Sequence, residues 1–297
     1  MRLNALKTLP LLALLAPMFA AAQAGGTLDK VKQAGAITLA YRESSIPFSY
    51  LDDKAQPVGF GYEICLKIVD EVKKATGSKD LKVNLQSVTS ANRIPLLQNG
   101  TIDIECGSTT NNSERGKQVQ FATNYFYTGT RFLVKAGTQI KSIDDLKGKT
   151  IVSTSGTTNY KILRNLNEEK KLSIDLLGAK DHADSALMVE SGRALAFGMD
   201  DILLYALRAS SQNPASLAVV GEAIQVEPYA IMLRKDDPAF KKLVDDTLAG
   251  LMKSGEFTKL YTKWFQSPIP PKGINLNAPM SPELVENLKA LSDKPAT

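Results

Sequence analysis

The sequence is poor in the residues that most catalytic and metal sites need. Its 297 residues include one histidine, His182, and two cysteines, Cys65 and Cys106. Structural zinc sites take four ligands of these types at short spacings, and no such pattern or H-E-x-x-H motif occurs. The G-x-S-x-G motif of many serine hydrolases is also missing. We therefore expect no metal, no cofactor and no catalytic residue.

The sequence also lacks the patterns of nucleic-acid and nucleotide binding. The formal charge of +5 falls to +3 if Arg2 and Lys7 are removed with a leader, which is too small to predict nucleic-acid binding. The segment IDDLKGKT has Ile143 where a phosphate-binding loop needs its first glycine, and GFGYEI departs from the dinucleotide motif at Ile64. We expect neither motif to function.

The first residues, MRLNALKTLPLLALLAPMFAAAQAGG, have the form of a secretory signal peptide. Arg2 and Lys7 precede a short apolar run, and small residues stand at Ala22 and Ala24. A membrane-spanning helix needs about twenty uninterrupted apolar residues, and this run is shorter and carries prolines. We expect cleavage near Ala24 and, since no cysteine lies there to accept a lipid, a soluble mature protein.

An exported protein meets oxidising conditions, which permit a disulfide between Cys65 and Cys106. Cys65 lies on the apolar face of an expected helix with Ile68 and Val72, and Cys106 ends an expected strand. Each cysteine could equally be a small buried apolar residue. The sequence leaves both states open.

Short apolar strands alternate with amphipathic helices after the leader, which predicts an α/β protein with largely parallel sheets. The segments 126–132 and 225–230 are predicted to be extended crossings between two lobes that form a hinge over a cleft.

The tail from Pro268 is proline-rich and is expected to run along the surface. We divide the chain into a signal peptide (1–24), lobe 1 (25–127), lobe 2 (128–226), and a return to lobe 1 with the tail (227–297). The expected strands are 36–41, 81–88, 101–106, 131–135, 150–153, 173–177, 194–198 and 229–235, and the expected helices include 62–75, 158–169, 183–190 and 202–209.

Polar side chains follow the expected strands, at the sheet edge where ligands of α/β proteins bind. Taken singly, each has an ordinary explanation as a helix cap, a surface ion pair or a structural histidine. Together they describe a ligand, because arginine forks and helix-start N–H groups bind carboxylates, and an aspartate binds an ammonium group. Two anionic groups and one cationic group make an acidic amino acid. The candidates are Arg42, Ser90, Arg93, Ser108, Thr110, Arg115, Thr157, Thr158, His182 and Asp200.

Stretches across nearly the whole mature chain resemble the periplasmic glutamate/aspartate-binding proteins, the solute-binding protein family 3 receptors of ABC-type uptake systems. The resemblance implies the two-lobed type II periplasmic binding protein fold, a periplasmic location, and a monomer that delivers L-glutamate or L-aspartate to an inner-membrane permease. Cys65 and the aromatic residues of FATNYFYTGT depart from the family pattern. The matching stretches are RESSIPFSY, NRIPLLQNGTIDIECGSTTNN, DDLKGK, TSGTT, AKDH, ESGRA, LRKDDP and SPIPP.

The resemblance also implies a role for each candidate. The α-carboxylate falls to Arg115, Thr110, Thr157 and Thr158, and the α-ammonium to Ser108 and Asp200. The side-chain carboxylate falls to Arg42, Ser90, Arg93 and His182. If a charged His182 lies against that carboxylate, binding should tighten as the pH falls. Glutamine should be rejected, whereas glutamate and aspartate differ by one methylene worth about 1–3 kcal/mol, so their order stays open.

Two other classes of function share these features. A ligand-binding sensor that docks on a chemoreceptor or a kinase ectodomain would have the same pocket. A dehydratase-type enzyme would have the same fold, with His182 as the base of a proton transfer. Because the sequence offers so little catalytic chemistry, we expect a receptor that closes about its hinge on the ligand.

Overall fold

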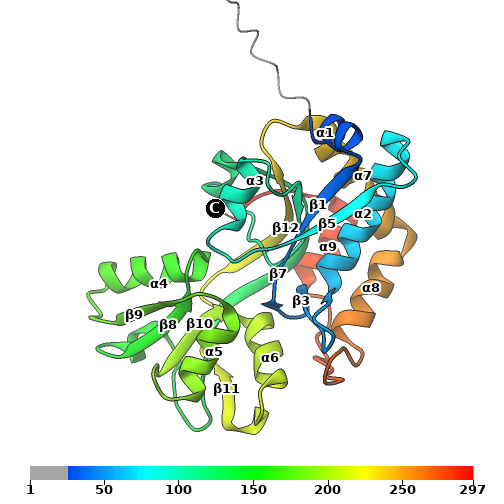
Figure 1. Ribbon diagram of the computed structural model, residues 1–297. Helices are drawn as coiled ribbons and strands as arrows, with labels where there is room; N and C mark the ends of the chain where they lie inside the picture. Colours follow the sequence, from blue (N-terminus) through cyan, green and yellow to red (C-terminus); the bar gives the residue numbers. More distant parts are fainter. Residues whose placement is uncertain (1–25, 297) are drawn as a thin grey trace, which may run out of the picture.

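Two long strands, β7 (Val119–Lys135) and β12 (Val226–Arg234), run side by side and connect the two lobes of the molecule (Figure 1). The computed structural model describes residues 26–296, so the predicted signal peptide lies outside the described residues. The strands pair antiparallel from Gly129 and Val226 to Val119 and Arg234. The two expected crossings lie on these strands. The proposed lobe limits fall inside β7 and at the start of β12.

The first lobe is built on the strands β5 (Lys82–Ser87), β1 (Ala36–Tyr41) and β6 (Ile104–Glu105), which extend the sheet beside β12. β1 is parallel to both β5 and β6, as expected, whereas β12 is antiparallel to β6. A small separate sheet holds β2 (Ser44–Ser45), β3 (Ser49–Leu51) and β4 (Pro57–Val58). The helices of this lobe are α1 (Thr27–Ala34), α2 (Phe60–Thr76), α3 (Arg93–Gln98), α7 (Pro238–Ser254), α8 (Glu256–Phe265) and α9 (Pro282–Ala290), with a 3-10 turn at Arg115–Lys117.

The second lobe continues the same sheet on the other side of β7. Its strands are β10 (Ala196–Asp200), β8 (Thr150–Thr154), β9 (Asp175–Ala179) and β11 (Leu217–Val220). β8 is parallel to β9 and β10, whereas β10 and β11 pair antiparallel with β7. The helices are α4 (Thr158–Glu169), α5 (His182–Glu190) and α6 (Asp201–Ser210), with 3-10 turns at Ile143–Leu146 and Pro214–Ser216.

The main core of the first lobe lies between its sheet and the helices α2, α7 and α8. α2 turns Ile64, Ile68 and Val72 inward at helical spacing and ends at Gly77, whose left-handed backbone permits the Lys73 and Lys74 carbonyls to be capped. Phe48 makes edge-to-face contacts with the rings of five residues around it, which fixes the loop after β2 against the core. This loop precedes α2 and supports the site side of the lobe.

The C-terminal region differs from its expectation. The segment from Pro268 was expected to run along the surface, but α9 forms at Pro282–Ala290 and buries Leu284 and Asn287 near β7. Ser281 caps this helix by accepting from the Leu284 N–H, and Pro282 takes the first helical position, where no N–H is needed. This short amphipathic helix was not predicted because the proline-rich sequence before it is typical of an irregular surface segment.

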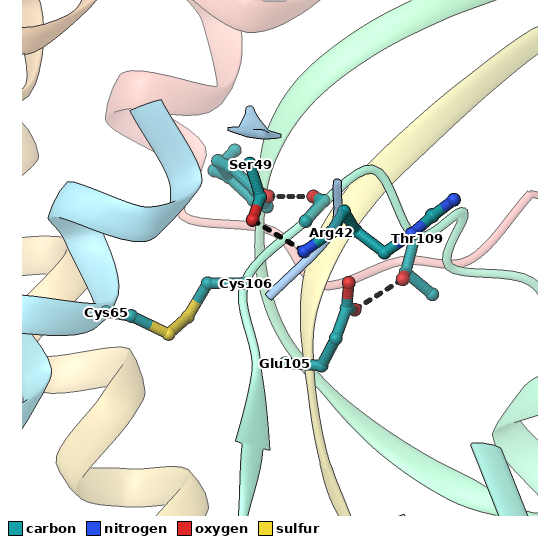
Figure 2. Close-up of a disulfide and its surroundings, with 8 residues drawn as sticks. Arg42, Ser49, Cys65, Glu105, Cys106 and Thr109 are labelled. Carbon is teal, nitrogen blue, oxygen red and sulfur yellow. Dashed lines mark hydrogen bonds between the residues drawn. A yellow bond between two sulfur atoms is a disulfide. The ribbon is translucent and has the colours of Figure 1, made fainter. Parts of the chain in front are cut away.

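Cys65 and Cys106 form a disulfide, which decides the question that the sequence left open (Figure 2). The bond joins the buried face of α2 to the residue after β6, with a Cα–Cα distance of 5.9 Å. Cys106 directly precedes the segment Gly107–Arg115 that carries three of the expected ligand residues. Within residues 26–296, the helices are all too short or too polar to cross a membrane.

Candidate ligand-binding site

The ten predicted ligand residues come together where the lobes meet. Nine of them are buried, and Thr158 is partly buried. The first lobe contributes loops and helix starts that follow β1, β5 and β6, and the second lobe contributes those that follow β8, β9 and β10. The expected common sheet edge is therefore where these side chains lie.

Arg42 follows β1 and is fully buried. Its backbone N–H donates to Ser49 Oγ, 2.9 Å away (Figure 2), and its Nη2 donates to Asp181 Oδ1 of the second lobe at 2.7 Å. Nη2 also lies 3.3 Å from His182 Nε2. The Arg42 Nε and Nη1 groups are buried and have no acceptor among residues 26–296. The guanidinium thus has two buried nitrogens whose N–H groups can donate hydrogen bonds but accept none.

Arg93 begins α3 and shares this arrangement. Its Nη1 donates to the Ser108 carbonyl at 3.3 Å and lies 3.8 Å from Glu105 Oε1, while its Nε has no acceptor in the described part of the chain. The neighbouring Ser90 Oγ is also buried and has no partner among the residues that the structure describes. Burial lowers the pKa of Arg93 to about 9, since desolvation disfavours the charged form; Glu105 opposes this shift, and Arg115 and Arg42 reinforce it. The guanidinium remains positive at neutral pH.

His182 begins α5 and is held in one neutral form. Guanidinium groups can only donate, so its Nε2 accepts from Arg42, and Nδ1 then carries the proton and donates to Thr154 Oγ1 at 2.9 Å. Burial lowers the pKa of His182 to about 3, and Arg42 adds to this shift while Asp181 opposes it. The imidazole contacts Arg42 in this neutral form, and the tightening of binding at lower pH, which was conditional on a charged imidazole, stays a prediction.

Arg115, Thr110 and Thr158 form a second group across the lobes. Arg115 Nη1 donates to the Thr110 carbonyl and Nη2 to the Gly156 carbonyl of the second lobe, both at 3.1 Å. Thr110 Oγ1 lies 3.2 Å from Thr158 Oγ1, and both donate to Glu227 Oε2 at 2.9 and 2.8 Å. Burial lowers the pKa of Arg115, an effect that Glu227 and Asp200 oppose. This group joins both lobes and the hinge strand β12.

Helix α4 points its start at the same region. Thr157 is its N-cap, accepting from the Tyr160 N–H, and Thr157 Oγ1 itself donates to the Thr154 carbonyl at 2.7 Å. The first N–H groups of a helix have no partner within it and favour an anion. The Thr157 hydroxyl is therefore structural, whereas the backbone at Thr158 can meet a carboxylate.

Asp200 ends β10 and is 1% exposed. It accepts from Asn159 Nδ2 at 2.7 Å and from the Tyr229 hydroxyl. Burial and the nearby Glu227 raise the pKa of Asp200 well above its ordinary value, and the two hydrogen bonds act against that rise. An ammonium group placed here would favour the ionised carboxylate.

Ser108 lies in the segment that the disulfide anchors. Its Oγ donates to Ser45 Oγ at 3.2 Å. Next to it, Thr109 Oγ1 donates to Glu105 Oε2 at 2.5 Å beside Arg42 (Figure 2), and the Tyr125 hydroxyl donates to the Gly107 carbonyl. These bonds fix the backbone of the segment that carries Ser108 and Thr110, of which Thr110 contacts Thr158 of the second lobe.

Three acidic residues of the site were missed by the sequence analysis: Glu105, Asp181 and Glu227. Asp181 was visible in the AKDH stretch, and Glu105 begins ECGSTT. Both touch a predicted arginine. Glu227 had no signal beyond its place in an expected crossing, since its contacts to Thr110 and Thr158 depend on how the lobes meet.

Two surface hollows help to delimit the site. One of ≈ 290 Å³ borders it, next to Arg115, Gly156 and Thr158. Another of ≈ 910 Å³ lies between α2 and α7, where lysines and acidic side chains of both helices line it. The second hollow contains none of the predicted ligand residues and has the mixed charge of a solvated helix surface.

Comparisons with known proteins agree with this architecture. The chain is 49% identical over 292 residues to an L-glutamate/L-aspartate-binding protein of Pseudomonas aeruginosa, covering 98% of this chain and 97% of that protein. It is 50% identical to a glutamate/aspartate import solute-binding protein of Escherichia coli K12, covering 93% and 91%. A mutant of the arginine-binding protein ArgBP from T. maritima has a similar structure, with a TM-score of 0.73, 26% identity and coverage of 81% and 99%.

A family model matches residues 37–267, which include all ten predicted ligand residues. The identity to the bacterial relatives extends over nearly the whole chain. The chain therefore belongs to the bacterial extracellular solute-binding proteins, family 3.

Proposed function

We propose that the protein is an extracytoplasmic receptor that binds L-glutamate or L-aspartate between its lobes and delivers it to an ABC transporter permease. The relatives that are half identical to it carry names for this ligand pair. We further propose that it works in the periplasm as a monomer after removal of residues 1–24. The division into lobe 1, lobe 2 and a return segment belongs to the same proposal.

The observation that carries this proposal is the set of buried donors that have no acceptor within residues 26–296: Arg42 Nε and Nη1, Arg93 Nε, and Ser90 Oγ. A buried polar group without a partner costs about 1–3 kcal/mol, and more when it is charged. One carboxylate between the two guanidinium groups can accept from all three residues. Asp181 accepts from Arg42 Nη2, and Glu105 lies 3.8 Å from Arg93 Nη1, yet neither takes up these remaining donors. In this proposal a ligand carboxylate accepts from them.

The other end of the ligand carries the α-ammonium and the α-carboxylate groups, which contact a second set of residues in this proposal. Asp200 and Ser108 receive the α-ammonium, while Arg115 and the start of α4 at Thr157 and Thr158 receive the α-carboxylate. The burial of Asp200 supports this assignment, since an ammonium partner would offset the cost of ionising a buried carboxyl group. The distance between the two ends along the cleft sets the choice between glutamate and aspartate.

The mechanism is closure of the hinge on β7 and β12. The lobes contact each other through Arg42 and Asp181 and through Arg115 and Gly156. A ligand that bridges the two sides favours the closed form by its differential contacts with it. The permease would then recognise the closed form.

A proton-transfer enzyme is a weaker proposal for this site. The imidazole of His182 is neutral, and both of its nitrogens are engaged, by Arg42 and by Thr154. A general base needs a free lone pair directed at the substrate. We therefore propose binding without catalysis.

Calorimetric titration of the mature protein, freed of bound ligand by unfolding and refolding, tests the function. L-glutamate, L-aspartate, L-glutamine and L-arginine are compared. We expect tight binding of at least one acidic amino acid and at least tenfold weaker binding of glutamine, since glutamine forfeits charge-assisted bonds of about 1.5–3 kcal/mol each. Tight binding of arginine or glutamine alone would contradict the proposal.

A further inference from the structure

Glu227 is a buried acid of the hinge strand β12 that contacts both lobes at once. Glu227 is fully buried. Its Oε2 accepts hydrogen bonds from Thr110 Oγ1 of the first lobe at 2.9 Å and from Thr158 Oγ1 of the second lobe at 2.8 Å. Its Oε1 accepts from Gln225 Nε2 at 3.0 Å. The three oxygens of Glu227, Thr110 and Thr158 make a closed triangle.

The protons of this triangle can be counted. An ionised carboxylate only accepts hydrogen bonds, and each threonine hydroxyl has one proton to donate and two lone pairs. With Thr110 and Thr158 both within hydrogen-bond distance of Oε2, each directs its proton to Glu227 or to the other hydroxyl. In every such arrangement the hydroxyl protons stay inside the triangle, and lone pairs of the threonines remain for a donor outside it.

We propose that Glu227 is a positioning residue that makes Thr110 and Thr158 hydrogen-bond acceptors, so that they favour the ammonium end of the ligand. The inference rests on the proposed function. It leaves the α-carboxylate to Arg115 and to the backbone N–H groups at the start of α4. Glu227 does not contact the ligand in this proposal. Through the two threonines it helps the site to distinguish an amino acid from a dicarboxylic acid that has no ammonium group.

The surroundings of Glu227 support this role. Arg115 Nη1 donates to the carbonyl of Thr110, one partner of Glu227, and Asp200 lies near enough for the two carboxylates to influence each other. The region around the triangle thus has two buried acidic side chains and one guanidinium, so it offers acceptors to a further cation. Because Glu227 holds one threonine from each lobe, the triangle forms only when the lobes approach.

The test substitutes Glu227→Gln, which keeps the size of the side chain and removes its charge. An amide can turn its NH₂ group toward the hydroxyls, which frees their protons to point elsewhere. Glu222→Gln is the matched control, since Glu222 is an exposed glutamate five positions earlier in the chain. Affinities for L-glutamate and for glutarate, which has both carboxylates and no ammonium, are measured by calorimetry and by competition, together with the melting temperature of each variant.

We expect Glu227→Gln to lower the affinity for L-glutamate by about tenfold or more, the effect of one charge-assisted hydrogen bond, and the affinity for glutarate by less than about threefold. Thr110→Val should show the same selective loss, and Glu222→Gln should leave both affinities unchanged. An unchanged affinity of Glu227→Gln for L-glutamate would overturn the inference, as would equal losses for the two ligands, because a merely structural role affects both.

The wild-type protein separates the two proposals. If it binds no acidic amino acid, the proposed function fails. If it binds L-glutamate or L-aspartate and the Glu227→Gln protein binds that ligand equally well, the function stands and the role of Glu227 fails.

Discussion

Gly156 provides a direct test of hinge closure, because it touches the opposite lobe. It lies in the second lobe just before α4, and its backbone has φ of +80°. A Cβ added there would lie 2.5 Å from Ala91 Cα and 2.8 Å from the Ser90 carbonyl carbon of the first lobe. Carbon atoms in contact are normally about 3.5–4.0 Å apart, so Gly156→Ala would force the lobes apart by about 1 Å at this point.

The substitution has two separable costs. A left-handed backbone costs a non-glycine residue about 1–2 kcal/mol, which lowers the stability of the second lobe whether the hinge is open or closed. The clash exists only in the closed form and lowers the ligand affinity. Since 1.4 kcal/mol corresponds to tenfold in affinity, even a partly relieved clash should weaken L-glutamate binding at least about tenfold.

Gly148→Ala is the matched control. Gly148 belongs to the same lobe and has φ of +67°, but a Cβ there would meet no atom within 4 Å. We expect both variants to lose similar stability in thermal unfolding, and only Gly156→Ala to lose affinity in calorimetry. Equal affinities for the two variants would refute the reasoning that the lobes must approach at Gly156 to hold the ligand.

Three further predictions concern the arginines, the disulfide and His182. Arg115→Ala should weaken the binding of every amino-acid ligand, whereas Arg42→Ala and Arg93→Ala should weaken the binding of acidic ligands selectively. Calorimetry with glutamate and glutamine measures both affinities. If all three variants lose the same affinity for both ligands, the assignment of the two ends of the ligand is wrong. Replacing Cys65 and Cys106 together by alanine opens a loop of 41 residues. Urea unfolding should then show that the free energy of unfolding falls by up to about 4 kcal/mol, and chemical reduction of the wild type should have the same effect. A change near zero would show that opening the loop gives the unfolded chain no additional freedom. The pKa of His182 falls to about 3 in the folded protein, against about 6.5 when unfolded, so the unfolded state binds the proton first and stability should fall as the pH drops from roughly 6 to 4, by about 1.4 kcal/mol per pH unit. A His182→Asn variant should lack this slope, and equal slopes in the two proteins would argue against a buried neutral imidazole.

Periodicity alone predicted much of the fold. All eight expected strands overlap observed ones, because strands such as β1 and β8 are short apolar runs bounded by turn residues. The two crossings were recognised because their extended segments flank a complete α/β unit. The small strands β2 to β4 were missed, since pairs of two or three residues leave no periodic signal. The helix α9 was missed because prolines precede it.

For the candidate site, the sequence predicted where the polar residues lie relative to the strands but not the contacts between them, and the roles of these residues stay predictions. Arg42, Arg93 and Asp200 could be singled out because each follows an expected strand, where ligands of α/β proteins bind. The state of His182 depends on the two groups that its nitrogens meet, Arg42 and Thr154, and no spacing in the sequence reports these contacts. Glu227 was missed for the same reason, since its partners come from both lobes.

The paired strands of the hinge should allow the second lobe to be exchanged between related proteins. Gly129 and Val226 are opposite one another in the sheet, so the segment between them leaves and re-enters the first lobe at neighbouring positions. Segments whose ends lie close together can be inserted into a host domain with little disturbance. Residues 130–225 are therefore a transplantable unit, and a chimera with the equivalent segment of a relative would combine the arginines of one receptor with the α4 start, His182 position and Asp200 position of another.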